Sequence, residues 1–179
     1  MELNKNKVIQ VGFLLVDEFS MIAFASAIEP LRAANRISGN NIYKWKTLSA
    51  DGKPVNSSNG ISIKADNFLD ENFHADILFI CSGLNIKDKV DKTVLGNLRK
   101  FSRRGIHLGS LCTASYLLAK AGLLSGRKST IHWENSISMK EDFPDLEITN
   151  NLFEIDRDRY SCSGGTSALD LMLNIITEN

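Results

Sequence analysis

The sequence of 179 residues lacks an excess of charge of either sign, because 21 lysines and arginines balance 21 aspartates and glutamates. A protein that binds nucleic acid usually presents a basic face. The sequence has no run of basic residues that could form such a face despite the zero net charge. We therefore expect this chain not to bind DNA tightly by itself. The sequence also has no apolar stretch long enough to cross a bilayer, and its polar start, MELNKNKVIQ, lacks a signal-peptide core. These absences predict a cytoplasmic protein without a membrane segment.

Cysteine and histidine are scarce, with three residues of each type. The cysteines are odd in number and show no C-x-x-C spacing, which favours reduced thiols over a disulfide framework. No metal-site spacing joins them to the histidines, so we expect neither a metal nor a cofactor. The residues concerned are Cys81, Cys112 and Cys162, and His74, His107 and His132.

Apolar runs alternate with helical patterns along the whole chain. Residues 7–16 and 75–83 are continuous apolar runs, typical of strands that are covered on both faces. Residues 20–37 carry apolar side chains at helical spacing behind Ser20, a residue suited to cap a helix. We expect further strands at 43–50, 61–65, 105–111, 128–132, 146–149, 152–155 and 160–163, and further helices at 91–103, directly after Cys112, at 134–142 and from 165 onward. This alternation predicts an α/β fold with a mostly parallel sheet and helices on both faces.

Cys112 stands between an apolar strand and a helical stretch of small residues, in the sequence SLCTA. A nucleophile elbow places its nucleophile on such a sharp turn and needs small residues nearby, here Ser110 and Ala114. The free N–H groups of a helix that begins directly after the sulfur would lower the pKa of the thiol. The same geometry accepts a polar or anionic ligand atom without any bond being broken. From the residues alone, Cys112 is either such an elbow or one more small buried residue.

The other cysteines and histidines have simpler interpretations. Cys81, inside the run ILFIC, is expected in the core, and His107, in an apolar strand, is expected to be a hydrogen-bonded core histidine. Cys162 precedes a double-glycine turn and could belong either to the core or to a site. His132 follows Cys112 by 20 residues, so the two could form a catalytic pair, line one pocket or be unrelated.

Several segments, in their order and spacing, resemble one branch of a known family. They are FSMIAFASAIEPLRAANRISG, CTASYLLAKAGLLSGRKSTIHW, FPDLEI and ALDLMLNII. Together they resemble the amidase-like domain of AraC-type transcriptional regulators, within the class I glutamine amidotransferase-like superfamily that also holds the PfpI-type proteases. The resemblance covers about residues 8 to 177. It implies that residues 1–179 form a single domain with a flavodoxin-like three-layer sandwich.

The resemblance also implies a site and partners. Cys112 and His132 would line one cleft for a small-molecule effector, with backbone from Gly83 and Leu84, and Thr113 would add to a mixed polar and apolar lining. The family further implies a homodimer and a C-terminal helix-turn-helix domain, through which the full-length protein would contact DNA. The last helical pattern has no cap before the sequence ends. We therefore expect this chain to be the front part of a longer regulator that lacks the DNA-binding domain.

One departure from the family pattern concerns an acidic residue. Enzymes of the superfamily usually place a carboxylate of the first helix against the cysteine, and Ala23 aligns with that position. Glu29 lies six residues on, about 240° around the helix, so it cannot simply substitute. Asp17, at the end of the first strand, is the other candidate replacement. Without a carboxylate, the thiol lacks an orienting and proton-transferring partner.

These observations lead to two main hypotheses, and a purely structural dimerisation module is a third class that stays open. We expect a non-catalytic domain that senses a ligand and dimerises. The alternative is a cysteine-dependent hydrolase, hydratase or glyoxalase, in which Cys112 is the nucleophile and His132 the base. In that case the backbone of Gly83 and Leu84 would form the oxyanion site.

Overall fold

The computed structural model describes residues 7–178, and its centre is a seven-stranded sheet with the order β10-β11-β7-β6-β1-β2-β5. Neighbouring strands are parallel, except that β10 and β11 form an antiparallel hairpin. The strands are β1 (Ile9–Leu15), β2 (Tyr43–Ser49), β5 (Asn67–Phe68), β6 (Ile77–Cys81), β7 (His107–Leu111), β10 (Phe153–Asp156) and β11 (Arg159–Cys162). The predicted, mostly parallel sheet is confirmed.

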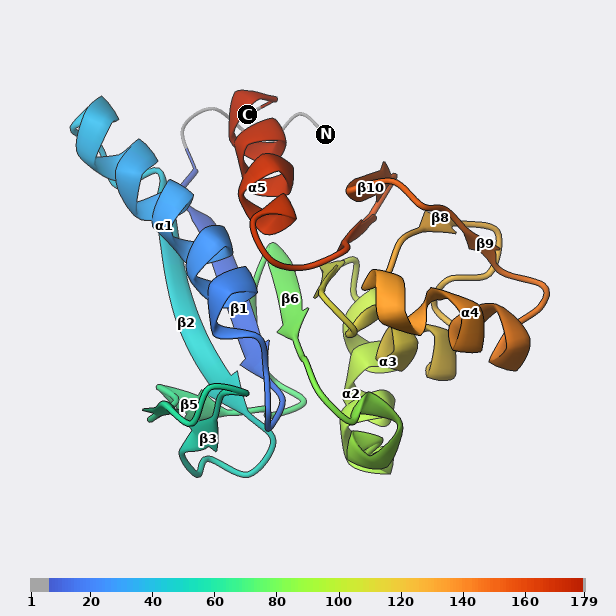
Figure 1. The fold of residues 1–179 in the computed structure, drawn as a ribbon. Coiled ribbons are helices and arrows are strands. Elements are labelled where there is room, and N and C mark those ends of the chain that lie inside the picture. The colour runs from blue at the N-terminus through green and yellow to red at the C-terminus, as the bar shows by residue number, and fades with distance from the viewer. Residues whose placement is uncertain (1–6, 179) are drawn as a thin grey trace.

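Helices cover both faces of this sheet (Figure 1). α1 (Met21–Ser38) and α5 (Ser167–Thr177) lie side by side on one face. α2 (Lys92–Arg103) and α3 (Ser115–Lys120) pack on the other face. Two separate hydrophobic clusters fill the space between each helical layer and the sheet. The predicted three-layer, flavodoxin-like architecture is therefore confirmed.

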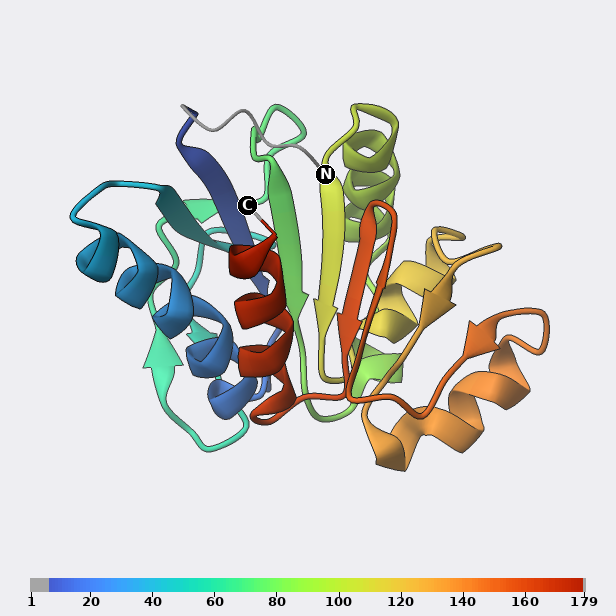
Figure 2. The same cartoon turned by 90° about the horizontal axis from the view of Figure 1, so that it is seen from above.

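Several short strands and helices lie outside the seven-stranded sheet. β3 (Val55–Asn56) and β4 (Ser62–Ile63) form a short antiparallel pair, and a 3-10 turn, η1 (Ile86–Lys89), precedes α2. β8 (Lys128–Ser129) pairs in parallel with β9 (Glu147–Ile148). Together with α4 (Trp133–Asp142), this pair extends the molecule beyond the β10–β11 hairpin (Figure 2). Among residues 7–178, no helix is both long and apolar enough to cross a membrane.

The local sequence explains where the main elements begin and end. In β1 every residue except Gln10 is buried, as its continuous apolar run predicts. The predicted cap of α1 is present, because Ser20 Oγ accepts the N–H of Ala23 at 3.4 Å. The helix ends at Gly39, whose φ of +70° is a conformation that glycine adopts without strain. Asp91 caps α2 by accepting two backbone N–H groups.

Two expected elements next to Cys112 differ from the structure, and the strands expected at 61–65 and 146–149 are shortened to Ser62–Ile63 and Glu147–Ile148. The helix predicted directly after Cys112 begins at Ser115, and only six residues belong to it. The strand predicted at 128–132 pairs only over Lys128–Ser129, because the chain then turns toward Cys112 and enters α4. Both differences lie next to the predicted site, and the first changes its electrostatics.

Candidate functional site

Cys112 follows β7 directly and has a φ of +64°, a conformation that residues other than glycine rarely adopt. Its N–H donates to the carbonyl of Cys162 at 3.1 Å, and its own carbonyl accepts the N–H of His132 at 3.2 Å. The turn is thus held by the end of β11 on one side and by the entry to α4 on the other. The sharp turn predicted at Cys112 is present.

Gly164 is a neighbour of the elbow that the sequence analysis missed. Its φ is +94°, and a Cβ at this position would lie 2.9 Å from the Cβ and 3.0 Å from the Sγ of Cys112. Only glycine therefore allows the loop between β11 and α5 to pack on the sulfur. The available signal was the Gly164–Gly165 pair, which we interpreted only as the entry to the last helix.

The sulfur of Cys112 is buried, with 6% of the residue exposed. Burial raises the pKa of this thiol to about 12, the neighbouring Cys162 raises it too, and the backbone N–H of Thr113 lowers it. The prediction that a helix N-terminus lowers the pKa is wrong. α3 begins three residues after the sulfur and is only six residues long, and the loss of solvent is the largest cause of the raised pKa.

Cys81 and Cys162 flank the elbow at the carboxyl ends of β6 and β11. Both lie level with Leu111, the last residue of β7, in the registers of the parallel strands. They are 1% and 0% exposed, and burial raises the pKa of each thiol. Cys81 is in the core as predicted. Cys162, which could have been either core or site, is a core residue whose backbone supports the elbow.

Thr113 ties the elbow to the carboxyl end of β6. Its hydroxyl donates to the carbonyl of Gly83 at 2.7 Å, so the Ser82 hydroxyl, 2.8 Å away, donates to Thr113. Gly83 has no room for a side chain, because a Cβ would lie 2.3 Å from the carbonyl oxygen of Glu18. The N–H of Leu84 donates to that same carbonyl at 3.1 Å. The structure thus brings Thr113, Gly83 and Leu84 together, with the Thr113 hydroxyl and the Leu84 N–H already hydrogen-bonded within the protein.

His132 reaches the elbow through its backbone. Its Nδ1 lies 3.8 Å from a carboxylate oxygen of Glu134, and its ring lies beside the exposed Trp133, with centroids 5.7 Å apart. Within residues 7–178, no hydrogen bond joins its imidazole to the sulfur of Cys112. The backbones of the two residues are hydrogen-bonded, but their side chains do not form a preassembled thiolate–imidazolium pair in the described structure.

No carboxylate of α1 accompanies the elbow. Ala23 is 1% exposed and belongs to the same hydrophobic cluster as the elbow cysteine, so the α1 side of this region is apolar. Glu29 pairs with Arg32 at 2.6 Å on the surface. Asp17 pairs with Lys89 at 3.2 Å. Both candidate replacements therefore have other partners.

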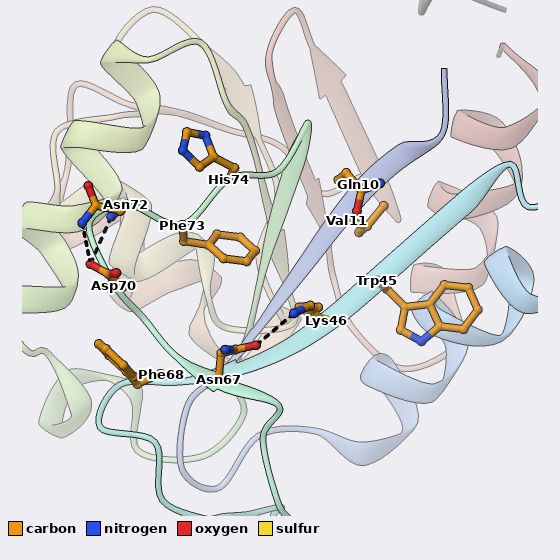
Figure 3. Close-up of a pocket in the computed structure, with 10 residues that line it drawn as sticks. All are labelled: Gln10, Val11, Trp45, Lys46, Asn67, Phe68, Asp70, Asn72, Phe73 and His74. Atoms are coloured by element: carbon orange, nitrogen blue, oxygen red, sulfur yellow. Dashed lines mark hydrogen bonds between the residues drawn. The ribbon is translucent and has the colours of Figure 1, made fainter. Parts of the chain in front are cut away.

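Two cavities in the described part of the chain have linings that do not include the elbow cysteine. One of about 280 Å³ lies beside β2 and β5, where Lys46 Nζ donates to Asn67 Oδ1 at 3.4 Å (Figure 3). Another, of about 320 Å³, lies at the carboxyl ends of β1 and β2. Neither is lined by Cys112 or His132, so the cleft between these two residues stays a prediction. Among residues 7–178, no group of three or more His, Cys, Asp or Glu side chains could hold a metal ion.

The sequence from residue 9 to 178 matches the DJ-1/PfpI family. The chain belongs to this family. It is 43% identical over 166 residues to the HTH-type transcriptional regulator GbdR of Pseudomonas aeruginosa, a match that covers 93% of this chain and 45% of the regulator. It is 38% identical over 170 residues to the HTH-type transcriptional regulator GlxA of Rhizobium meliloti, covering 94% and 52%.

A solved structure agrees with these sequence relationships. The crystal structure of an AraC family transcriptional regulator from Pseudomonas putida matches this DJ-1/PfpI domain with a TM-score of 0.86 and 30% identity, covering 95% of this chain and 91% of that one. The predicted relationship to AraC-type regulators is confirmed. The chain spans about half the length of the curated relatives it matches.

Proposed function

We propose that this DJ-1/PfpI domain is the effector-sensing part of an AraC-type transcriptional regulator and that it does not catalyse a reaction. A small metabolite binds beside Cys112, against Gly83, Leu84, Thr113 and His132. Its binding favours one conformation or assembly of the domain, which is the requirement for a switch. A helix-turn-helix domain elsewhere in the full-length protein contacts DNA.

The burial of the elbow sulfur, without a carboxylate at Ala23, carries this proposal. A cysteine enzyme attacks with a thiolate, which a neighbouring base or positive charge normally stabilises. Burial raises the pKa of the Cys112 thiol to about 12, which favours the thiol over the thiolate near pH 7. Ala23 supplies no carboxylate, and the His132 imidazole forms no hydrogen bond with the sulfur in the described structure. These features favour binding over bond breaking.

A dimer is part of the same proposal. Regulators with helix-turn-helix domains often bind two half-sites, and a two-fold protein matches such sites. The relatives GbdR and GlxA are HTH-type transcriptional regulators, which supports the same expectation here. An effector could then act by changing how two copies of the domain are arranged.

A thermal-shift screen with a panel of small metabolites tests the sensing function. A ligand at 100 times its Kd stabilises the folded state by about 2.7 kcal/mol, which raises the Tm measurably. The shift should shrink in Cys112→Ser and in His132→Ala. It should persist in Ile137→Ala, a control on the exposed face of α4. A panel without hits, or hits that keep their full shift in both site variants, would contradict the proposed site.

Turnover assays test the enzyme alternative. The wild-type chain should hydrolyse p-nitrophenyl acetate and convert methylglyoxal at background rates, because the thiol is protonated and has no base. Clear turnover that disappears in Cys112→Ser would overturn the non-catalytic assignment. Cys112→Ser should fold normally, since a small polar side chain suits the position.

A further inference from the structure

The cavity of about 320 Å³ at the carboxyl ends of β1 and β2 has the features of a small-molecule site, and we call it the β1/β2 cavity. The carboxyl ends of parallel strands, marked by the arrowheads in Figure 1, are where open α/β sheets bind ligands. Its volume lies in the range of known ligand pockets. Neither Cys112 nor His132 lines it, so it is separate from the site proposed at the elbow.

The wall of the β1/β2 cavity is mainly apolar. Leu14 and Leu15 are the last residues of β1, Val94 comes from α2 and Leu117 from α3. Leu15 and Val55 belong to one of the two hydrophobic clusters, whereas Leu14, Val94 and Leu117 belong to the other. The cavity therefore borders both clusters, and an apolar molecule that fills it would extend the packing of each.

Ser49 is a buried polar residue in this wall. It is the last residue of β2, is 1% exposed and lines the cavity. Its hydroxyl forms no hydrogen bond within residues 7–178. A buried hydroxyl without a partner costs free energy, so an unpartnered one points to a partner that the chain itself does not supply. A ligand atom in the cavity can be that partner.

The charged residues around the cavity already have partners. Lys89 Nζ lies 3.2 Å from a carboxylate oxygen of Asp17, and Lys53 Nζ lies 2.9 Å from one of Asp51. Asp91 accepts two backbone N–H groups of α2 and so occupies the N-terminal end of that helix. A charged ligand would have to compete with these interactions and would lose its hydration against an apolar wall. The lining therefore favours a neutral molecule.

We propose that the β1/β2 cavity is a second ligand site, which binds a small neutral molecule with an apolar body and one hydroxyl, carbonyl or amide group. The apolar body packs against Leu14, Val94 and Leu117, and the polar group forms a hydrogen bond with the Ser49 hydroxyl. This site does not depend on the effector proposed at the elbow, because the two linings share no residue.

Methyl NMR titrations of the 179-residue chain test the site with four probes of similar size, namely benzyl alcohol, toluene, benzoate and benzylamine. Benzyl alcohol should shift the methyl signals of Leu14, Val94 and Leu117. It should bind at least about tenfold more tightly than benzoate or benzylamine, because only the charged probes lose ionic hydration. The methyl signals of Ile137, on the exposed face of α4, should not move.

Ser49→Ala separates the hydrogen bond from the packing. It should raise the dissociation constant of benzyl alcohol about threefold to tenfold and leave that of toluene unchanged, because toluene has no hydroxyl. Its Tm should equal or exceed that of wild type, since no hydrogen bond within the described structure is lost. Ser129→Ala is the matched control, because Ser129 is also 1% exposed with an unpartnered hydroxyl but does not line the cavity. It should leave both dissociation constants unchanged.

Several results would overturn the proposal. One is the absence of shifts at Leu14, Val94 and Leu117 with benzyl alcohol at tens of millimolar, or shifts that extend to Ile137. Another is tighter binding of benzoate or benzylamine than of benzyl alcohol. A third is a Ser49→Ala variant that binds benzyl alcohol as tightly as wild type, or one whose loss of affinity Ser129→Ala reproduces.

Discussion

Alkylation of Cys112 by iodoacetamide should be slow at neutral pH, because only the thiolate reacts. Burial raises the pKa of this thiol from its ordinary value of 9.0 to about 12. Three pKa units lower the thiolate fraction near pH 7 about 1,000-fold. Labelling should therefore be much slower than that of a free cysteine, although the greater nucleophilicity of a high-pKa thiolate offsets part of the loss. Its rate should rise about tenfold for each pH unit between pH 7 and 10 and should not level off. Mass spectrometry of proteolytic peptides follows each cysteine separately.

Two further comparisons sharpen this experiment. Cys112 should label before Cys81 and Cys162, because it is 6% exposed and they are 1% and 0% exposed. In concentrated guanidinium chloride all three should label at similar rates, which shows that the folded structure causes the difference. A labelling rate that levels off below about pH 9 would refute the reasoning from burial and favour an activated nucleophile. Faster labelling of Cys81 than of Cys112 would refute the position of the elbow.

Three other predictions follow from single contacts, and each is measured by denaturant unfolding. Gly83→Ala should destabilise the fold by about 3 kcal/mol or more, because the new Cβ would lie 2.3 Å from a backbone oxygen. Gly96→Ala is the control: it lies in α2 with open space around it and should stabilise the fold by about 0.5–1 kcal/mol. Thr113→Val should cost about 2–3 kcal/mol by removing two buried hydrogen bonds, and Thr113→Ser should cost clearly less; equal losses would contradict the hydrogen-bond account. Tyr160→Phe should cost about 1–2 kcal/mol, because it removes the 2.9 Å hydrogen bond to His107; an unchanged stability would refute this.

Much of the fold could be predicted because its signals are local. The continuous apolar runs at 7–16 and 75–83 predicted β1 and β6, since strands covered on both faces contain few polar residues. The capping residue Ser20 fixed the start of α1. His107 was expected to be a hydrogen-bonded core histidine, and it is hydrogen-bonded to Tyr160. Each of these features depends on a few consecutive residues or on one simple pattern.

The features that escaped prediction depend on distant parts of the chain. β5 consists of two exposed residues, Asn67 and Phe68, so it has no apolar pattern and exists only because β2 lies beside it. The contact of Gly164 with Cys112 requires the loop after β11 to fold onto the end of β7. The pKa of the thiol depends on how deeply that contact buries the sulfur. Each of these features depends on two segments that are distant in the sequence, so neither segment alone predicts it.

The backbone conformation of Cys112 does not depend on the ionisation of its thiol, because different interactions stabilise each. Backbone hydrogen bonds and the packing of Gly164 hold Cys112 at positive φ, and none of them requires a charged sulfur. Activation would need a carboxylate at Ala23, which is 1% exposed in an apolar cluster. Ala23→Glu should therefore cost about 3 kcal/mol or more in denaturant unfolding, because it buries a carboxyl group without a partner. An Ala23→Glu variant that is as stable as wild type and labels rapidly at Cys112 would refute this view. The expected loss of stability means that this substitution alone should not activate Cys112.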